Sequence, residues 1–132
     1  CFRNIDVDDL TKHKTDSEQM FVSSEACEKV NRAKEAGKKV CAVGTTTLRA
    51  TETAVGPSGL LKDFDGWTNK FIFPPYDFQV CNAFLVNFQM PLSTRLMLVT
   101  AFGGYDLIMK AYQTALDNDY KFGTYGDVML II

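Results

Sequence analysis

The chain has 132 residues, of which 46% are hydrophobic and 23% charged, as is ordinary for one globular domain with a hydrophobic core. Its net charge of −2 argues against a nucleic-acid interface spread over the whole surface, and four widely spaced cysteines with one histidine exclude the usual zinc-binding spacings. Packed free thiols, and the lack of an apolar stretch long enough to span a bilayer, predict a soluble cytoplasmic protein without a metal site.

The first part of the chain contains two predicted helices and one buried strand. Residues 1–22 are polar with scattered apolar residues and indicate short strands and loops; their abrupt start predicts that the chain continues a larger protein. Ser24 can cap a helix over 24–36, whose first turn is acidic. The apolar run that ends the segment 39–43 is typical of a strand covered on both faces. A second helix is predicted over 45–55, capped by its first residue.

The rest of the chain continues this alternation. Turn residues and apolar runs predict, in order, a loop over 57–69, a strand over 71–73, a strand over 83–88, helices over 93–102 and 105–117, and a terminal strand over 128–132. Strands that alternate with helices are typical of α/β proteins. We therefore predict one α/β domain over residues 1–132, with three layers in which helices cover both faces of a mostly parallel sheet.

Small polar residues stand at two corners where a predicted strand passes into a helix. Gly44, Thr45 and Thr46 follow the first strand, and residues 87–94 follow the strand at 83–88. Helix N-termini expose N–H groups and a partial positive charge, which suit carboxylates, phosphates and ribose oxygens. Ligands of open α/β sheets gather at the carboxyl ends of strands. The two corners therefore predict one shared binding cleft.

Six sequence blocks carry a resemblance to a known family. They are Val-Gly-Thr-Thr-Thr-Leu-Arg (43–49), Phe-Ile-Phe-Pro-Pro-Tyr-Asp-Phe (71–78), Asn-Phe-Gln-Met-Pro-Leu-Ser-Thr (87–94), Met97-Leu98-Val99, Ala101-Phe102-Gly103 and Tyr125-Gly126-Asp127. In this order and spacing they resemble the S-adenosylmethionine:tRNA ribosyltransferase-isomerases of queuosine biosynthesis. The resemblance implies that residues 1–132 form the C-terminal portion of the major domain of a larger two-domain enzyme.

The resemblance also implies an activity. Enzymes of this family transfer and isomerise the ribosyl moiety of S-adenosylmethionine onto a 7-aminomethyl-7-deazaguanine base in tRNA, while adenine and methionine leave. S-adenosylmethionine is then the co-substrate and tRNA the partner, with no metal and no membrane involved.

The resemblance selects candidate site residues as well. The candidate base for this reaction is one of His13, Glu18 and Asp127, with Tyr125 nearby in sequence. The candidate residues that bind S-adenosylmethionine are Gly44, Thr45, Thr46, Arg49, Asn87, Gln89, Ser93 and Thr94.

Several of these residues have a structural alternative. Thr45 and Ser93 can simply cap their helices. Arg49 lies one helical turn after Thr45 and can bind the methionine carboxylate or a tRNA phosphate, or form a surface salt bridge with Glu52 or Asp63.

The candidate amide, imidazole and phenol side chains can likewise either contact a ligand or have a structural role. Asn87 and Gln89 alternate with a phenylalanine, so both point to one side of the strand end, where they can read a base or ribose or bond within the loop. His13 can be a structural hydrogen bonder. Tyr76 is the one aromatic residue expected to stack on adenine or a tRNA base.

Four positions depart from the pattern of the family. Where the family typically has His, Asp, His and Lys, this chain has Asp16, Asn82, Gln89 and Leu92. These changes remove titratable groups from blocks that would do acid–base work or hold phosphate, and they predict slow turnover. They leave open a non-catalytic or divergent paralogue that binds a nucleoside or RNA, or a generic nucleotide-binding domain.

Overall fold

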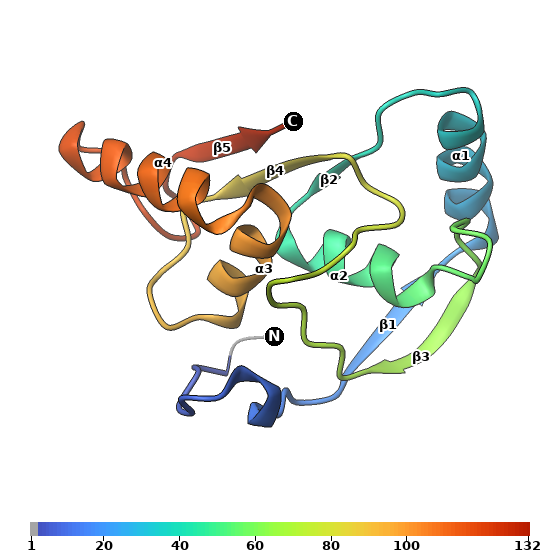
Figure 1. Cartoon of the computed structure of the whole chain (residues 1–132). Helices are drawn as coiled ribbons and strands as arrows, with labels where there is room; N and C mark the ends of the chain where they lie inside the picture. The colour runs from blue at the N-terminus through green and yellow to red at the C-terminus, as the bar shows by residue number, and fades with distance from the viewer. Residues whose placement is uncertain (1–2) are drawn as a thin grey trace.

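Four α-helices, five strands and one short 3-10 helix build the described part of the structure, a computed structural model in which residues 3–132 are described (Figure 1). In chain order they are η1 (Leu10–Lys12), β1 (Glu18–Val22), α1 (Ser24–Glu35), β2 (Cys41–Val43), α2 (Thr45–Ala54), β3 (Phe64–Thr68), β4 (Ala83–Asn87), α3 (Thr94–Gly103), α4 (Tyr105–Asp117) and β5 (Val128–Ile131). The mixed α/β class and all four predicted helices are confirmed, with each helix end within one residue of its predicted position.

Local signals explain where three of the helices begin. The Ser23 hydroxyl accepts a hydrogen bond from the backbone N–H of Ala26 at 3.2 Å, so Ser23 is the cap of α1, not Ser24 as predicted. Helix α2 begins after Gly44, whose φ of 87° is favourable only for glycine, and no side chain caps this helix. Ser93 caps α3 by accepting from the N–H of Leu96 at 3.1 Å.

The central sheet has the strand order β2-β4-β5 and is mixed instead of mostly parallel. Strands β2 and β4 are parallel, with Ala42 opposite Phe84, whereas β5 runs antiparallel to β4, with Ile131 also opposite Phe84. The number of intervening helices explains the difference. Helix α2, strand β3 and the loop that follows return the chain to the start of the sheet, whereas α3 and α4 together bring it back to the carboxyl end of β4.

A second, two-stranded sheet pairs β1 with β3 in antiparallel register, from Glu18 opposite Thr68 to Val22 opposite Phe64. The sequence prediction was wrong at two points here. The predicted loop over 57–69 contains β3, and the predicted strand over 71–73 is irregular. A strand needs a hydrogen-bonding neighbour. Strand β1 supplies one for β3, whereas Phe71 packs its ring on His13, with ring centroids 4.9 Å apart.

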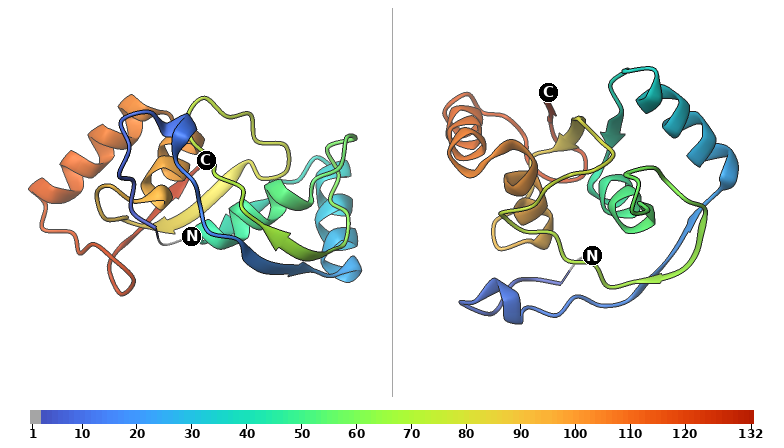
Figure 2. Two further views of the ribbon diagram at one scale, coloured as in Figure 1. Left: turned by 90° about the horizontal axis from the view of Figure 1, so that it is seen from below. Right: turned by 45° about the vertical axis from the view of Figure 1, so that its right-hand side comes forward.

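Helices cover one face of the central sheet, so the expected third layer is not formed by the described residues (Figure 2). On the covered face, Phe84 and Val86 are buried together with core residues of α2, α3 and α4. On the opposite face, Val43 and Leu130 are 63% and 57% exposed. The described part of the chain contains no helix long and apolar enough to cross a membrane.

Candidate functional site

A cleft of about 190 Å³ opens at the carboxyl ends of β2 and β4; we call it the strand-end cleft. Its lining is Gly44, Thr45, Thr46, Val86, Asn87, Gln89, Met90, Arg95, Gly123 and Thr124. The N–H of Gly44 donates to the carbonyl of Leu85 at 2.9 Å, which joins the corner after β2 to strand β4. Both predicted corners therefore contribute residues to one cleft, although Ser93 and Thr94 do not line it, and its role in binding stays a prediction.

Hydrogen bonds hold both amide side chains of this cleft. The NH₂ group of Asn87 donates to the carbonyl of Gly126 at 3.0 Å, and that of Gln89 donates to the carbonyl of Asn87 at 2.7 Å. The backbone N–H of Gln89 donates to the phenol oxygen of Tyr112, also at 2.7 Å. The Asn87 NH₂ group uses both of its donors within the fold, on the carbonyls of Gly126 and Asp127, and that of Gln89 uses one. The amide oxygens can therefore accept hydrogen bonds from a ligand, and the second N–H of Gln89 can donate one.

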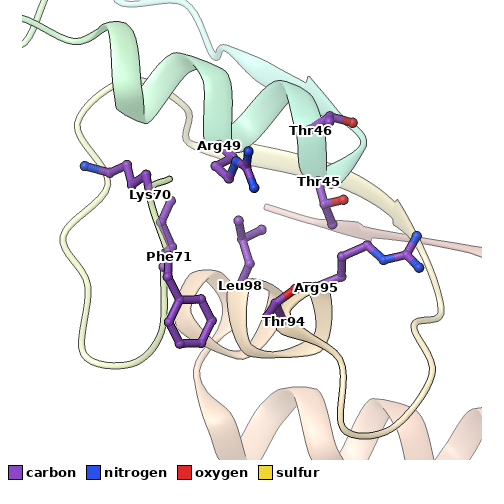
Figure 3. Close-up of a pocket in the computed structure, with 9 residues that line it drawn as sticks. Thr45, Thr46, Arg49, Lys70, Phe71, Thr94, Arg95 and Leu98 are labelled. Atoms are coloured by element: carbon purple, nitrogen blue, oxygen red, sulfur yellow. The ribbon is translucent and has the colours of Figure 1, made fainter. Parts of the chain in front are cut away.

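A narrow cavity of about 20 Å³ lies between the first turns of α2 and α3; we call it the narrow cavity (Figure 3). It is lined by Thr45, Thr46, Arg49, Lys70, Phe71, Ile72, Thr94, Arg95 and Leu98. Thr45, Thr46 and Arg95 line the strand-end cleft as well, so the two spaces are neighbours. A volume of this size holds about one water-sized group.

Arg49 is 7% exposed and lies between the narrow cavity and β1. Its Nη2 atom forms an ion pair with Glu18 of β1, whereas its buried Nη1 atom has no hydrogen-bond partner among the described residues. The predicted surface pairing with Glu52 or Asp63 is wrong. The carboxylate of Glu52 instead points to the loop before β4 and accepts from the Tyr76 hydroxyl and from the N–H groups of Gln79 and Val80.

The three candidate bases lie in different surroundings. Glu18 contacts Arg49, and its side chain, 33% exposed, lines a wider pocket of about 460 Å³ together with Thr46. His13 is 7% exposed against Phe71, and its Nε2 atom has no hydrogen-bond partner within residues 3–132. The carboxylate of Asp127 accepts from the backbone N–H of Lys121 at 2.7 Å, which closes the turn before β5.

Other predicted residues have mainly structural contacts. The Ser93 hydroxyl caps α3 and donates to the carbonyl of Met90 at 2.8 Å, whereas the neighbouring Thr94 lines the narrow cavity. Tyr76 is half-buried and donates to Glu52 at 3.2 Å. Burial, and then the nearby Glu52 carboxylate, raise the pKa of the Tyr76 phenol well above its usual value.

Only one of the four departures from the family pattern, Gln89, lines the strand-end cleft or the narrow cavity. Asp16 pairs with Arg3 at 3.4 Å on the surface. The Asn82 side chain accepts from the N–H of Val40 at 2.8 Å, at the opposite end of β4. Leu92 is 69% exposed. The predicted loss of chemical groups is therefore concentrated at Gln89.

Sequence reasoning missed two cations of the site, Arg95 and Lys70. Arg95 directly follows the predicted Thr94 in the first turn of α3, so its position at a helix N-terminus beside a chosen residue could have indicated it. Lys70 belongs to an irregular segment, and its nearness to Arg49 depends on long-range packing. No Asp or Glu of the described chain lines the narrow cavity or the strand-end cleft.

Comparison with known proteins decides the family. A model of the family described as queuosine biosynthesis protein matches residues 1–131. The chain belongs to this family. It is 69% identical over 131 residues to an S-adenosylmethionine:tRNA ribosyltransferase-isomerase of Phocaeicola vulgatus and 67% identical to one of Bacteroides fragilis. The alignments cover 99% of this chain and 37% of each relative, so the chain spans well under half the length of these proteins.

A solved structure of the family has the same fold. The crystal structure of an S-adenosylmethionine tRNA ribosyltransferase from Thermotoga maritima superposes with a TM-score of 0.80 at 41% sequence identity. The match covers 85% of this chain and 39% of that one. Within residues 3–132, no cluster of three or more His, Cys, Asp or Glu side chains could hold a metal ion.

Proposed function

We propose that the full-length protein carrying this segment is an S-adenosylmethionine:tRNA ribosyltransferase-isomerase that makes a queuosine precursor on tRNA in the cytoplasm. One observation carries the proposal: the two sequence blocks that resemble the family, 43–49 and 87–94, come together in space and line one cleft. The names of the relatives from Phocaeicola vulgatus and Bacteroides fragilis support the same activity.

The strand-end cleft suits the nucleoside part of the co-substrate. Thr45 and Thr46 offer hydroxyl groups at an uncapped helix N-terminus, and Asn87 and Gln89 offer amide oxygens. Ribose hydroxyls and the amino group of a base can donate to those oxygens, while the helix N–H groups can donate to ligand oxygens. In this proposal S-adenosylmethionine is consumed as co-substrate, and the tRNA base approaches the same cleft.

Glu18 is our first candidate for the base. The positive sulfur of S-adenosylmethionine acidifies the protons on the adjacent ribose carbon, and a carboxylate within hydrogen-bond reach can remove one of them. Glu18 lines an open pocket and is next to Arg49, which favours its charged form. His13 is buried against Phe71, and the Asp127 carboxylate holds a turn.

Adenine release tests the proposal. Full-length protein is mixed with S-adenosylmethionine and tRNA that carries 7-aminomethyl-7-deazaguanine, and free adenine is measured by chromatography. We expect adenine only when both substrates are present, and a rate about 10²–10⁴-fold lower for Glu18→Gln, with His13→Gln and Asp127→Asn measured beside it. Glu35→Gln, an exposed change on α1, is the matched control.

Two outcomes would contradict this. Binding of S-adenosylmethionine or tRNA without adenine release would favour the divergent, non-catalytic paralogue. An unchanged rate for Glu18→Gln together with a large loss for His13→Gln or Asp127→Asn would move the base to one of those residues.

A further inference from the structure

Arg49 uses only part of its hydrogen-bonding capacity in the described structure. Nη2 pairs with Glu18, while Nη1 is buried without a partner and the residue lines the narrow cavity. Figure 3 shows Arg49 on α2 and Leu98 on α3 pointing toward each other across this space. A buried charged donor that lacks an acceptor is costly, and such a group is commonly satisfied by a bound water or ligand.

The surroundings of this atom favour a negative group. The first turns of α2 and α3 both line the narrow cavity, through Thr45 and Thr94, and no side chain caps α2. Arg95 lines the same cavity, whereas the ammonium group of Lys70 lies over the Tyr76 ring, 5.5 Å from its centroid. Apolar side chains of Ile72 and Leu98 close the rest, which reduces the screening of charge by water.

The size of the narrow cavity limits what can enter it. Its volume of about 20 Å³ is close to that of one water-sized group, so one oxygen fits and a whole phosphate or nucleoside does not. The remainder of the ligand has room in the strand-end cleft of about 190 Å³, which shares Thr45, Thr46 and Arg95 with the narrow cavity.

We infer that the narrow cavity is an oxyanion subsite in which Arg49 binds one oxygen of a carboxylate or phosphate through Nη1. The ion pair of Glu18 with Nη2 orients the planar guanidinium. The identity of the ligand rests on the proposed function. Two groups have this chemistry: the methionine carboxylate of S-adenosylmethionine and a phosphodiester of the tRNA.

Decarboxylated S-adenosylmethionine separates the two sources, because it lacks only the carboxylate. Affinities of the full-length protein for it and for S-adenosylmethionine are measured by calorimetry. If Arg49 binds the carboxylate, we expect the wild type to bind S-adenosylmethionine on the order of 10- to 150-fold more tightly, and Arg49→Met to bind both compounds equally. Arg32→Met, an exposed cation on α1, should keep the wild-type ratio.

If Arg49 binds a phosphate instead, the change appears with tRNA. Arg49→Met should then lower tRNA affinity and reduce the slope of log affinity against log salt by about one phosphate contact, while the ratio between the two small molecules stays at the wild-type value. Arg49→Lys, which keeps one charge without the planar fork, should fall between wild type and Arg49→Met in whichever measurement responds.

The inference is overturned if the wild type binds both small molecules equally and neither Arg49 variant changes tRNA affinity or its salt slope; a water molecule would then satisfy Nη1. The wild-type ratio needs no mutation, so misfolding of a variant does not obscure the test of the carboxylate. If the Arg49 variants release adenine at the wild-type rate, the subsite is rejected and the proposed function is kept. Carboxylate-dependent binding without adenine release would keep the subsite and reject the proposed function.

Discussion

Replacing Glu52 should weaken the fold more than any surface change, because this buried carboxylate accepts three hydrogen bonds from one loop. Glu52 is 1% exposed, and it accepts from the Tyr76 hydroxyl at 3.2 Å, the Gln79 N–H at 3.1 Å and the Val80 N–H at 3.2 Å. The loop leads from the narrow cavity to β4, so its position affects Phe71 and Ile72.

The magnitude follows from the donors that Glu52→Ala would abandon. Val80 is buried and Tyr76 half-buried, and each unpaired buried donor costs about 1–3 kcal/mol, whereas water can reach the exposed Gln79. We therefore expect Glu52→Ala to lower the free energy of unfolding by about 2–6 kcal/mol. Glu52→Gln keeps one acceptor oxygen and the side-chain shape, and should lose about half as much.

Urea denaturation measures the global effect, and hydrogen exchange measures the local one. The amides of Gln79 and Val80 should exchange about 10-fold faster or more in Glu52→Ala, because their acceptor is gone. The matched control is Glu35→Ala, which removes an exposed carboxylate from α1 and should change stability by less than about 0.5 kcal/mol. A Glu52→Ala protein with wild-type stability and unchanged exchange at these two amides would refute this account of the loop.

Three further predictions concern a cap, a hydroxyl and alkaline pH. Ser23→Ala should lower the free energy of unfolding by about 1 kcal/mol and Ser24→Ala should not, since only Ser23 caps α1; equal losses in denaturation would contradict the observed cap. Tyr112→Phe should cost about 1–3 kcal/mol by leaving the Gln89 N–H unpaired, and should weaken nucleoside binding in a titration. Burial raises the pKa of Tyr112, so above about pH 10 the unfolded phenol ionises while the folded one stays neutral, and stability falls as pH rises. The fall should be less steep in Tyr112→Phe, and identical slopes between pH 10 and 11 would show that Tyr112 does not contribute.

The sequence by itself determined the four helices and the corner residues that line the cleft. Apolar periodicity and turn residues are local signals, and they located α2 and α4 to within one residue. The corner residues Gly44 and Asn87 also followed from local pattern, because the carboxyl ends of two parallel neighbours meet at one edge of a sheet.

Only the tertiary structure decided which segments pair. A strand is completed by hydrogen bonds to a distant segment, so the apolar run at 71–73 stayed irregular while residues around the exposed Trp67 became β3 opposite β1. Helices α3 and α4 together return the chain to the carboxyl end of β4, so β5 runs antiparallel to β4.

Charge pairing was equally non-local. Arg49 and Glu52 are one helical turn apart in sequence, yet Arg49 pairs with Glu18 and Glu52 holds the loop before β4. Both side chains are buried, and a buried charge or donor must be satisfied by whichever groups the packed chain brings near it. That geometry depends on the arrangement of β1, α2 and the 71–80 loop in space, which no local pattern of residues specifies.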